Sequence, residues 1–159
     1  MQWYSKLLDT NPIITKCLSA GFISSIGNVL AQGINHPQVS RFALLNILFV
    51  APILHHWYQF INKAVPGRAF SKVLQRTFWD EFIFTPMYLP VFLGMLWKSE
   101  GTTNDNIIKM IISELPSIIT AEWLVWVPTM IVTFRYIPMK FQVLTINLIG
   151  IFWQTFLSY

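Results

Sequence analysis

Residues 115–159 read LPSIITAEWLVWVPTMIVTFRYIPMKFQVLTINLIGIFWQTFLSY and decide the fold. Two long apolar runs flank a short basic turn at 135–140, and Trp, Tyr and Phe recur near the ends of both runs. The second run, 141–159, contains no charged residue. At ~1.5 Å per residue, a helix over this run would be ~28 Å long, which is close to the thickness of the hydrocarbon core of a bilayer. The stretch therefore predicts helices that cross a membrane.

The composition of the whole chain favours the same environment. The chain has 159 residues and is 54% hydrophobic but only 11% charged, whereas about 25% of the residues in a soluble domain are charged. Aromatic residues make up 16% of the chain, and Trp and Tyr favour the interface between membrane and water. One domain is the natural count for this length, so we expect residues 1–159 to form a single transmembrane helical domain.

The cysteine count and the N-terminus exclude several alternatives. Cys17 is the single cysteine, which excludes an internal disulfide and a cysteine-built metal site, so we expect it to pack on a membrane helix. The first residues, MQWYSKLLDTNP, lack a basic region before an apolar core and a small-residue cleavage site. We therefore expect neither a secretory signal nor a transit peptide.

Five apolar segments follow one another along the chain, at 12–32, 41–61, 78–97, 117–134 and 141–159. In the first segment, small residues such as Gly21, Ser24 and Ser25 recur every three or four positions, which lets a second helix pack closely. Backbone exposed to lipid must satisfy its hydrogen bonds within one segment, so we expect helices and no strands. The pattern predicts an all-α bundle of four to five transmembrane helices with one or two interfacial amphipathic helices.

Two stretches between these segments predict the interfacial helices. Over 70–79, basic side chains recur every four residues, which is typical of a helix that lies on a membrane surface. Apolar residues at helical spacing over 107–115 predict a second surface helix. The excess of Lys and Arg in the linker 62–76 places that linker and the N-terminus on the cytoplasmic or matrix side by the positive-inside rule.

Motifs of enzymes and cofactor proteins are absent from the sequence. It contains no nucleotide-binding loop, metal-ligand cluster, nucleophile elbow or haem-attachment motif. His55 and His56 are adjacent and would point ~100° apart on a helix, so they cannot bind one metal together. We therefore expect a non-enzymatic protein with no catalytic residues, no metal, no cofactor and no nucleic-acid partner.

The order and spacing of many residues match a known pattern over nearly the whole chain. They are Trp3-Tyr4, Pro12, Thr15, Lys16, Gly21, Gly27, Gln32, Arg41, the run Pro52-x-x-His55-x-Trp57-Tyr58, Lys72, Asp80 and Pro86. The most specific part is C-terminal and comprises Trp126, Phe134, Pro138, Trp153 and Leu157-Ser158. With these residues the chain resembles the family named for the twenty-two-kilodalton peroxisomal membrane protein and its mitochondrial inner-membrane relative, the Mpv-seventeen protein.

The chain departs from the family pattern mainly at polar positions. The family's Gly-Asp is Gly27-Asn28 here, its Asp-Gln is Asp80-Glu81, and its Trp-Pro pair has the proline one place later, at Pro128. Met130, Thr133 and Gln142 stand where the family has Gln, Asn and Arg. Polar side chains inside a bilayer are usually kept for a water path or a partner. We therefore expect any inherited path to be interrupted.

Several polar residues remain within or beside the apolar segments, and they are the candidate functional residues. They are Asn28, Asn46, His55, Asp80, Glu81 and Glu122. For Asp80 and Glu81 we expect solvation at the interface; the alternative is a buried carboxylate paired with Arg76, Lys72 or a histidine. We expect Glu122 to find a hydroxyl, a backbone amide or a basic side chain rather than to gate a path. We expect His55 and Trp57 to be interface anchors rather than to line a conducting path.

Two functions remain open at this point. The resemblance implies a channel-like or membrane-homeostasis role in an organelle membrane, the mitochondrial inner membrane first and the peroxisomal or another membrane second. The alternative is an accessory subunit packed against a larger membrane complex, which the loss of polar residues favours. The expected partners are the lipid bilayer and either complex subunits or further copies of this chain.

Overall fold

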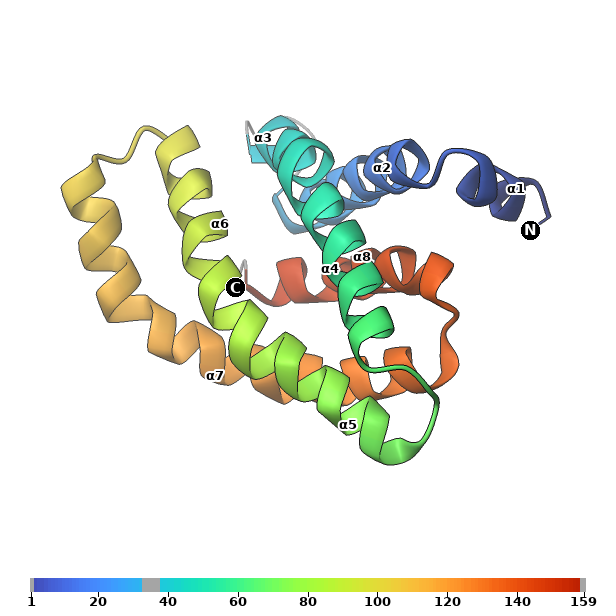
Figure 1. Ribbon diagram of the computed structural model, residues 1–159. Coiled ribbons are helices and arrows are strands. Elements are labelled where there is room, and N and C mark those ends of the chain that lie inside the picture. Colours follow the sequence, from blue (N-terminus) through green and yellow to red (C-terminus); the bar gives the residue numbers. More distant parts are fainter. Residues whose placement is uncertain (1, 33–37, 158–159) are drawn as a thin grey trace. The chain divides into compact units, whose positions relative to one another are not determined.

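The computed structural model describes residues 2–32 and 38–157, and the regular elements in these ranges are helices without a strand (Figure 1). The expected all-α class is therefore confirmed. In chain order the elements are α1 (Gln2–Thr10), α2 (Pro12–Gln32), α3 (Gln38–Leu45), the π-helix η1 (Asn46–Val50), α4 (Ala51–Ala64), α5 (Phe70–Phe78), the π-helix η2 (Trp79–Phe84), α6 (Thr85–Ser99), α7 (Asn104–Tyr136) and α8 (Met139–Leu157).

The helices form two compact units. Unit 1 comprises Met1–Phe60 and Pro138–Tyr159, and unit 2 comprises Ile61–Ile137. In unit 1, α2 packs against α8, α3 and η1, and in unit 2, α7 packs against α5 and α6. The expected single domain over the whole chain stays a prediction.

The small-residue face of α2 is a packing surface, as its spacing predicts. A Cβ atom placed on Gly21 would overlap the side chain of Ile47 in η1, so the two helices approach closely at this position. Cys17, Ala20 and Ala51 form a buried apolar cluster beside Ile47. Cys17 is therefore a packing residue, which confirms the expectation for the single cysteine.

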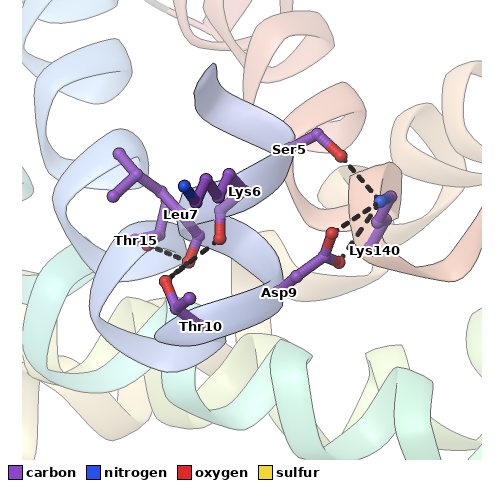
Figure 2. A network of polar contacts seen from close by, with 7 residues as sticks. All are labelled: Ser5, Lys6, Leu7, Asp9, Thr10, Thr15 and Lys140. Carbon is purple, nitrogen blue, oxygen red and sulfur yellow. Dashed lines mark hydrogen bonds and ion pairs between the residues drawn. The ribbon is translucent and has the colours of Figure 1, made fainter. Parts of the chain in front are cut away.

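Helix α1 is held in unit 1 by polar contacts that the sequence analysis did not predict (Figure 2). The Lys140 ammonium group donates to Ser5 Oγ at 2.7 Å and forms an ion pair with Asp9 at 3.2 Å. The Thr15 hydroxyl donates to the carbonyl of Leu7 at 3.1 Å. These contacts join α1 to α8 and α2. Because the ion pair is partly exposed, its contribution to stability is only about 0–1 kcal/mol.

Unit 2 is built around one long helix where two elements were expected. The surface helix at 107–115 and the apolar segment at 117–134 are one continuous helix, α7, of 33 residues. Pro116 and Pro128 lie inside it, and Figure 1 shows that it bends along its length. The prediction of two elements was wrong. A proline that would end a helix in water is tolerated in an apolar setting, where leaving backbone groups unpaired is more costly.

The remaining segments agree with the structure within a few residues. The expected segment 12–32 is α2, and 41–61 falls within α3 to α4. The segment 78–97 begins at the last residue of α5 and continues through η2 into α6, and 141–157 falls within α8, while 158–159 lie outside the described residues. The expected amphipathic helix at 70–79 is α5. Two stretches of the described residues are long and apolar enough to cross a membrane, Ala43–Ala64 and Asn104–Tyr136. The number of crossings thus stays a prediction.

Candidate functional site

The candidate site in unit 2 begins with the π-helix η2, and its sequence explains that geometry. The N–H of Thr85 donates to the carbonyl of Asp80, five residues earlier, instead of the usual four. The next residue, Pro86, has no N–H and its ring crowds the preceding turn. The carbonyl of Glu81 therefore lacks its partner within the helix and accepts a hydrogen bond from the indole Nε1–H of Trp123 at 2.8 Å.

Unit 1 contains a second π-helical turn of the same kind, η1. The N–H of Ala51 donates to the carbonyl of Asn46, again five residues earlier, and Pro52 follows directly. In both units a polar residue thus begins a π-helical turn that ends one position before a proline. A π-helical turn places an extra residue in the helix and often marks a functional site. The turns aim Asn46 in unit 1 and both Asp80 and Glu81 in unit 2 into the packed interior, where all three are buried.

Glu81 and Glu122 are two acidic residues on neighbouring helices of unit 2, η2 and α7. Glu81 is only 2% exposed, and Glu122 lies next to Trp123, the residue of α7 whose indole N–H donates to the Glu81 carbonyl. One oxygen of each group, Oε2 in both cases, is buried without a hydrogen-bond partner. Next to the pair, the rings of Phe82 and Trp123 pack with centroids 4.7 Å apart. The two acids therefore lie in a closely packed apolar contact between η2 and α7.

These positions correct three expectations. Asp80 and Glu81 are 3% and 2% exposed, so they are not solvated at an interface. The alternative, a buried carboxylate, is right for Glu81 as to burial, but its Oε2 atom has no hydrogen-bond partner in the described structure, so the expected pairing is not seen at that atom. Glu122 was expected to find a hydroxyl, an amide or a base, but its Oε2 atom is likewise buried without a hydrogen-bond partner in the described structure. A pattern within one segment of the sequence gives no signal that residues 81 and 122 belong to neighbouring helices.

A second buried polar cluster lies in unit 1, between α2 and α4. The Lys16 ammonium group donates to His55 Nδ1 at 3.1 Å, and the Gln59 side chain contacts His55 Nε2 at 3.0 Å. Lysine has donors only, so His55 must accept at Nδ1 and carry its proton at Nε2. The atom of Gln59 placed at His55 Nε2 is the amide nitrogen, so the amide group must be turned by about 180° for its oxygen to accept that proton. The chain of contacts holds one neutral histidine and one buried amine.

His55 is therefore not an interface anchor, because it is 3% exposed and bound to Lys16, which is 5% exposed. Sequence reasoning missed Lys16 as a site residue. The available signal was a lysine one turn into an otherwise apolar segment. Trp57 is half-buried and packs against Phe60 with ring centroids 5.8 Å apart, while Tyr58 is buried.

Arg76 is a third polar residue that the sequence analysis undervalued. Its guanidinium group is 4% exposed and donates to Asn62 Oδ1 at 2.6 Å, to the Gly67 carbonyl at 2.9 Å and to the Phe134 carbonyl at 3.4 Å. It also lies over the Phe134 ring, 5.3 Å from the centroid. Gly67 has a positive φ of 105°, which favours glycine in this turn. Arg76 thus joins the turn before α5 to the last turn of α7.

The other predicted site residues lie apart from these clusters. Pro52, Trp126 and Trp153 are half-buried, Phe134 is buried against Arg76, and Pro138 is exposed between α7 and α8. Asn28 belongs to α2, but its side chain lies outside the described part of the structure. Among the described residues, no three His, Cys, Asp or Glu side chains gather as a metal site.

Helices long and apolar enough to cross a membrane, with ionisable side chains buried among them, define the class of helical membrane proteins. Within that class, the chain belongs to the Mpv17 / PMP22 family, whose pattern matches residues 99–158. The resemblance inferred from individual residues is thereby confirmed.

The similarity to individual relatives extends over nearly the full chain. PXMP2/4 family protein 2 of Dictyostelium discoideum is 30% identical, with 98% of this chain and 88% of that protein covered. Peroxisomal membrane protein 2 of Bos taurus is 27% identical, with 98% and 86% covered. Mitochondrial inner membrane protein Mpv17 of Danio rerio is 22% identical, with 98% and 93% covered. No solved structure matches the chain.

Proposed function

We propose that this chain is a non-enzymatic protein of an organelle membrane with a channel-like role in membrane permeability. The observation that carries the proposal is the burial of ionisable side chains in each unit, Lys16 with His55 in unit 1 and Glu81 in unit 2. Ionisable side chains are costly inside a membrane, and in membrane proteins they usually mark a path for ions or solutes. A helical bundle with a purely structural role could be built with apolar side chains at these positions.

The mitochondrial inner membrane is our first choice of location, with the peroxisomal membrane second. Relatives named for each membrane cover almost the whole chain. The positive-inside rule supports an orientation with the N-terminus on the matrix or cytoplasmic side. We propose that four to five helices cross, with α2 and α8 as the shorter apolar crossings beside α4 and α7.

The expectation of an interrupted path rested on Met130, Thr133 and Gln142, and all three are buried. We give the channel-like role precedence, because ionisable side chains are still buried at other positions, namely Lys16, His55 and Glu81. The second candidate, an accessory subunit, is favoured by α7. Only 11% of the most apolar stretch of α7 is buried within the structure. Most of this stretch is therefore available to lipid, to a complex subunit or to a second copy of the chain.

The test of the channel-like role is solute release from sealed liposomes that contain the purified chain. We expect small charged solutes to leave about tenfold faster than from protein-free liposomes. Replacing the buried cation, Lys16→Gln, should change the ratio of anion to cation release, because a fixed charge on a path sets its selectivity. The matched control is Lys109→Gln, at an exposed lysine of α7. Release equal to that from protein-free liposomes would favour the accessory subunit instead.

A further inference from the structure

The charged side chains of unit 2 are unevenly distributed along its helices. The turn before α5 and the last turn of α7 carry only cations, since no Asp or Glu occurs at 61–79 or at 123–137. The exposed acids of this unit belong to the connection between α6 and α7 and to the first half of α7; they are Glu100, Asp105 and Glu114. Along the axis of α7, Glu114 lies ~30 Å from Arg135 at ~1.5 Å per residue. This is several times the Debye length of ~8 Å at physiological salt, so the acids do not neutralise the basic end.

The turn before α5 and the end of α7 are joined by hydrogen bonds, and this brings their cations together. The buried Arg76 donates to the carbonyl of Gly67 in the turn and to the carbonyl of Phe134 in α7. Arg135, the next residue of α7, donates to the carbonyl of Arg68 in the same turn. Figure 1 shows α5 beside the C-terminal part of α7, with which it packs. The side chains of Arg68 and Arg135 therefore start from one local surface of unit 2.

Lys72 belongs to the same surface, and the three cations keep donors for a ligand. A Cβ atom placed on Gly67 would lie 3.9 Å from Lys72 Cγ, so the stem of the lysine runs past the turn. Its ammonium group donates to Gln75 Oε1 at 3.2 Å. Arg68 and Arg135 are exposed, and a guanidinium group has five N–H donors, of which one nitrogen of Arg135 is used on the turn. Within the described ranges, the ion pairs of the structure include none of these three side chains.

Exposed apolar side chains lie beside the cations. On α5, Phe70, Leu74 and Phe78 are exposed and recur every four residues, so they share one face of the helix. On α7, Tyr136 is exposed directly after Arg135. An apolar stripe beside basic residues and a tyrosine at a helix end are both typical of the interface between membrane and water. Since α7 is long and apolar enough to cross a bilayer, a crossing brings its last turn to the level of the phospholipid headgroups.

We propose that Arg68, Lys72 and Arg135 form a binding site for the headgroups of anionic phospholipids in the surrounding bilayer. A planar guanidinium group can bind a phosphate group with two parallel hydrogen bonds, and a lysine adds a point charge. A zwitterionic phospholipid has the same phosphate group, but its own cation is repelled by the cluster. The apolar stripe of α5 can contact the acyl chains of the bound lipid, which a free phosphate ion lacks. This inference requires that the chain lies in a membrane and does not depend on the channel-like role.

The experiment measures lipid contact in phosphatidylcholine vesicles that contain the purified chain. Small amounts of spin-labelled phosphatidylglycerol or spin-labelled phosphatidylcholine report the fraction of each lipid whose motion the protein restricts. One basic side chain near a membrane surface strengthens the binding of anionic lipid by about fivefold, so we expect a preference for phosphatidylglycerol of about twofold or more after averaging over every lipid around the chain. Raising the salt concentration from about 0.1 M to about 1 M should weaken this preference in the wild type, since the Debye length falls from ~10 Å to ~3 Å.

Two double variants with the same loss of charge locate the site. Arg68→Gln with Arg135→Gln should remove most of the preference, whereas Lys98→Gln with Lys109→Gln should keep it. All four side chains are exposed, so both variants should fold. An equal loss in both variants, a wild type without a preference, or a preference that salt does not change would each overturn the proposal. A stronger effect of inorganic phosphate than of sodium chloride at equal ionic strength would assign the site to a free anion and would also overturn it.

Discussion

Replacing Arg76 with alanine should lower the free energy of unfolding by about 3 kcal/mol or more. The guanidinium group is buried and donates to one amide oxygen and two backbone carbonyls, on Asn62, Gly67 and Phe134. The alanine variant removes all three hydrogen bonds, and a hydrogen bond to a charged group is worth about 1.5–3 kcal/mol. The loss of the stacking contact with the Phe134 ring adds to the effect. Chemical unfolding of the detergent-solubilised protein measures it.

Two further variants separate geometry from charge. Arg76→Lys keeps the positive charge but has no planar fork, so we expect it to recover less than half of the lost stability. Arg135→Ala removes an exposed arginine that donates to the Arg68 carbonyl, and should cost no more than about 1 kcal/mol. Equal stability of Arg76→Ala and Arg135→Ala would contradict the proposed role of Arg76 in joining the turn to α7.

Enlarging Gly21 should have an effect of similar size in unit 1. A Cβ atom there already overlaps the Ile47 side chain, so Gly21→Leu must push α2 away from η1. Overpacking of this kind costs about 1–3 kcal/mol and sometimes more, and we expect the yield of extractable folded protein to fall steeply. Gly21→Ala should be intermediate, because Ile47 is only half-buried and can shift.

The matched control is Gly150→Leu in α8, since nothing lies within 4 Å of a Cβ atom at Gly150. This variant should leave the thermal unfolding midpoint within a few degrees of wild type, because leucine also favours the helix over glycine. If Gly21→Leu and Gly150→Leu unfold at the same temperature, the close approach of α2 to η1 does not stabilise the protein.

The helices could be predicted from sequence because their signals are local. The apolar run of α2 and the basic spacing of α5 are both contained in one segment, so their bounds agree with the structure within a few residues. The helix α7 was divided incorrectly because the amphipathic pattern at 107–115 and the apolar segment at 117–134 were interpreted as two elements. The change of pattern along the chain marks a change of surroundings along one helix and not its end. Pro116, inside α7, does not end it either, since prolines in apolar helices are tolerated when neighbouring groups satisfy the backbone.

The candidate site was predictable only as a set of unusual residues. His55, Glu81 and Glu122 stood out because each is polar within an apolar segment. Their surroundings could not be predicted, since Lys16 is 39 residues from His55 and Trp123, which donates to the Glu81 carbonyl, is 42 residues from Glu81. The π-helical turns, which aim Asp80 and Glu81 into the interior together, also have no reliable sequence pattern. Pro86 and Pro52 were visible, but a proline predicts a kink and not which residues it turns inward.

Membrane crossing by α7 underlies every functional inference drawn from Glu122. The direct measurement uses single cysteines at the two ends of this helix, Thr103→Cys and Ile137→Cys, each in a Cys17→Ala background that removes the natural thiol. Sealed organelle membranes containing each variant are treated with a membrane-impermeant thiol reagent. We predict that the two positions react from opposite sides, so that one is labelled in intact membranes and the other only after the membrane is opened. Labelling of both positions from the same side of intact membranes would contradict a crossing by α7.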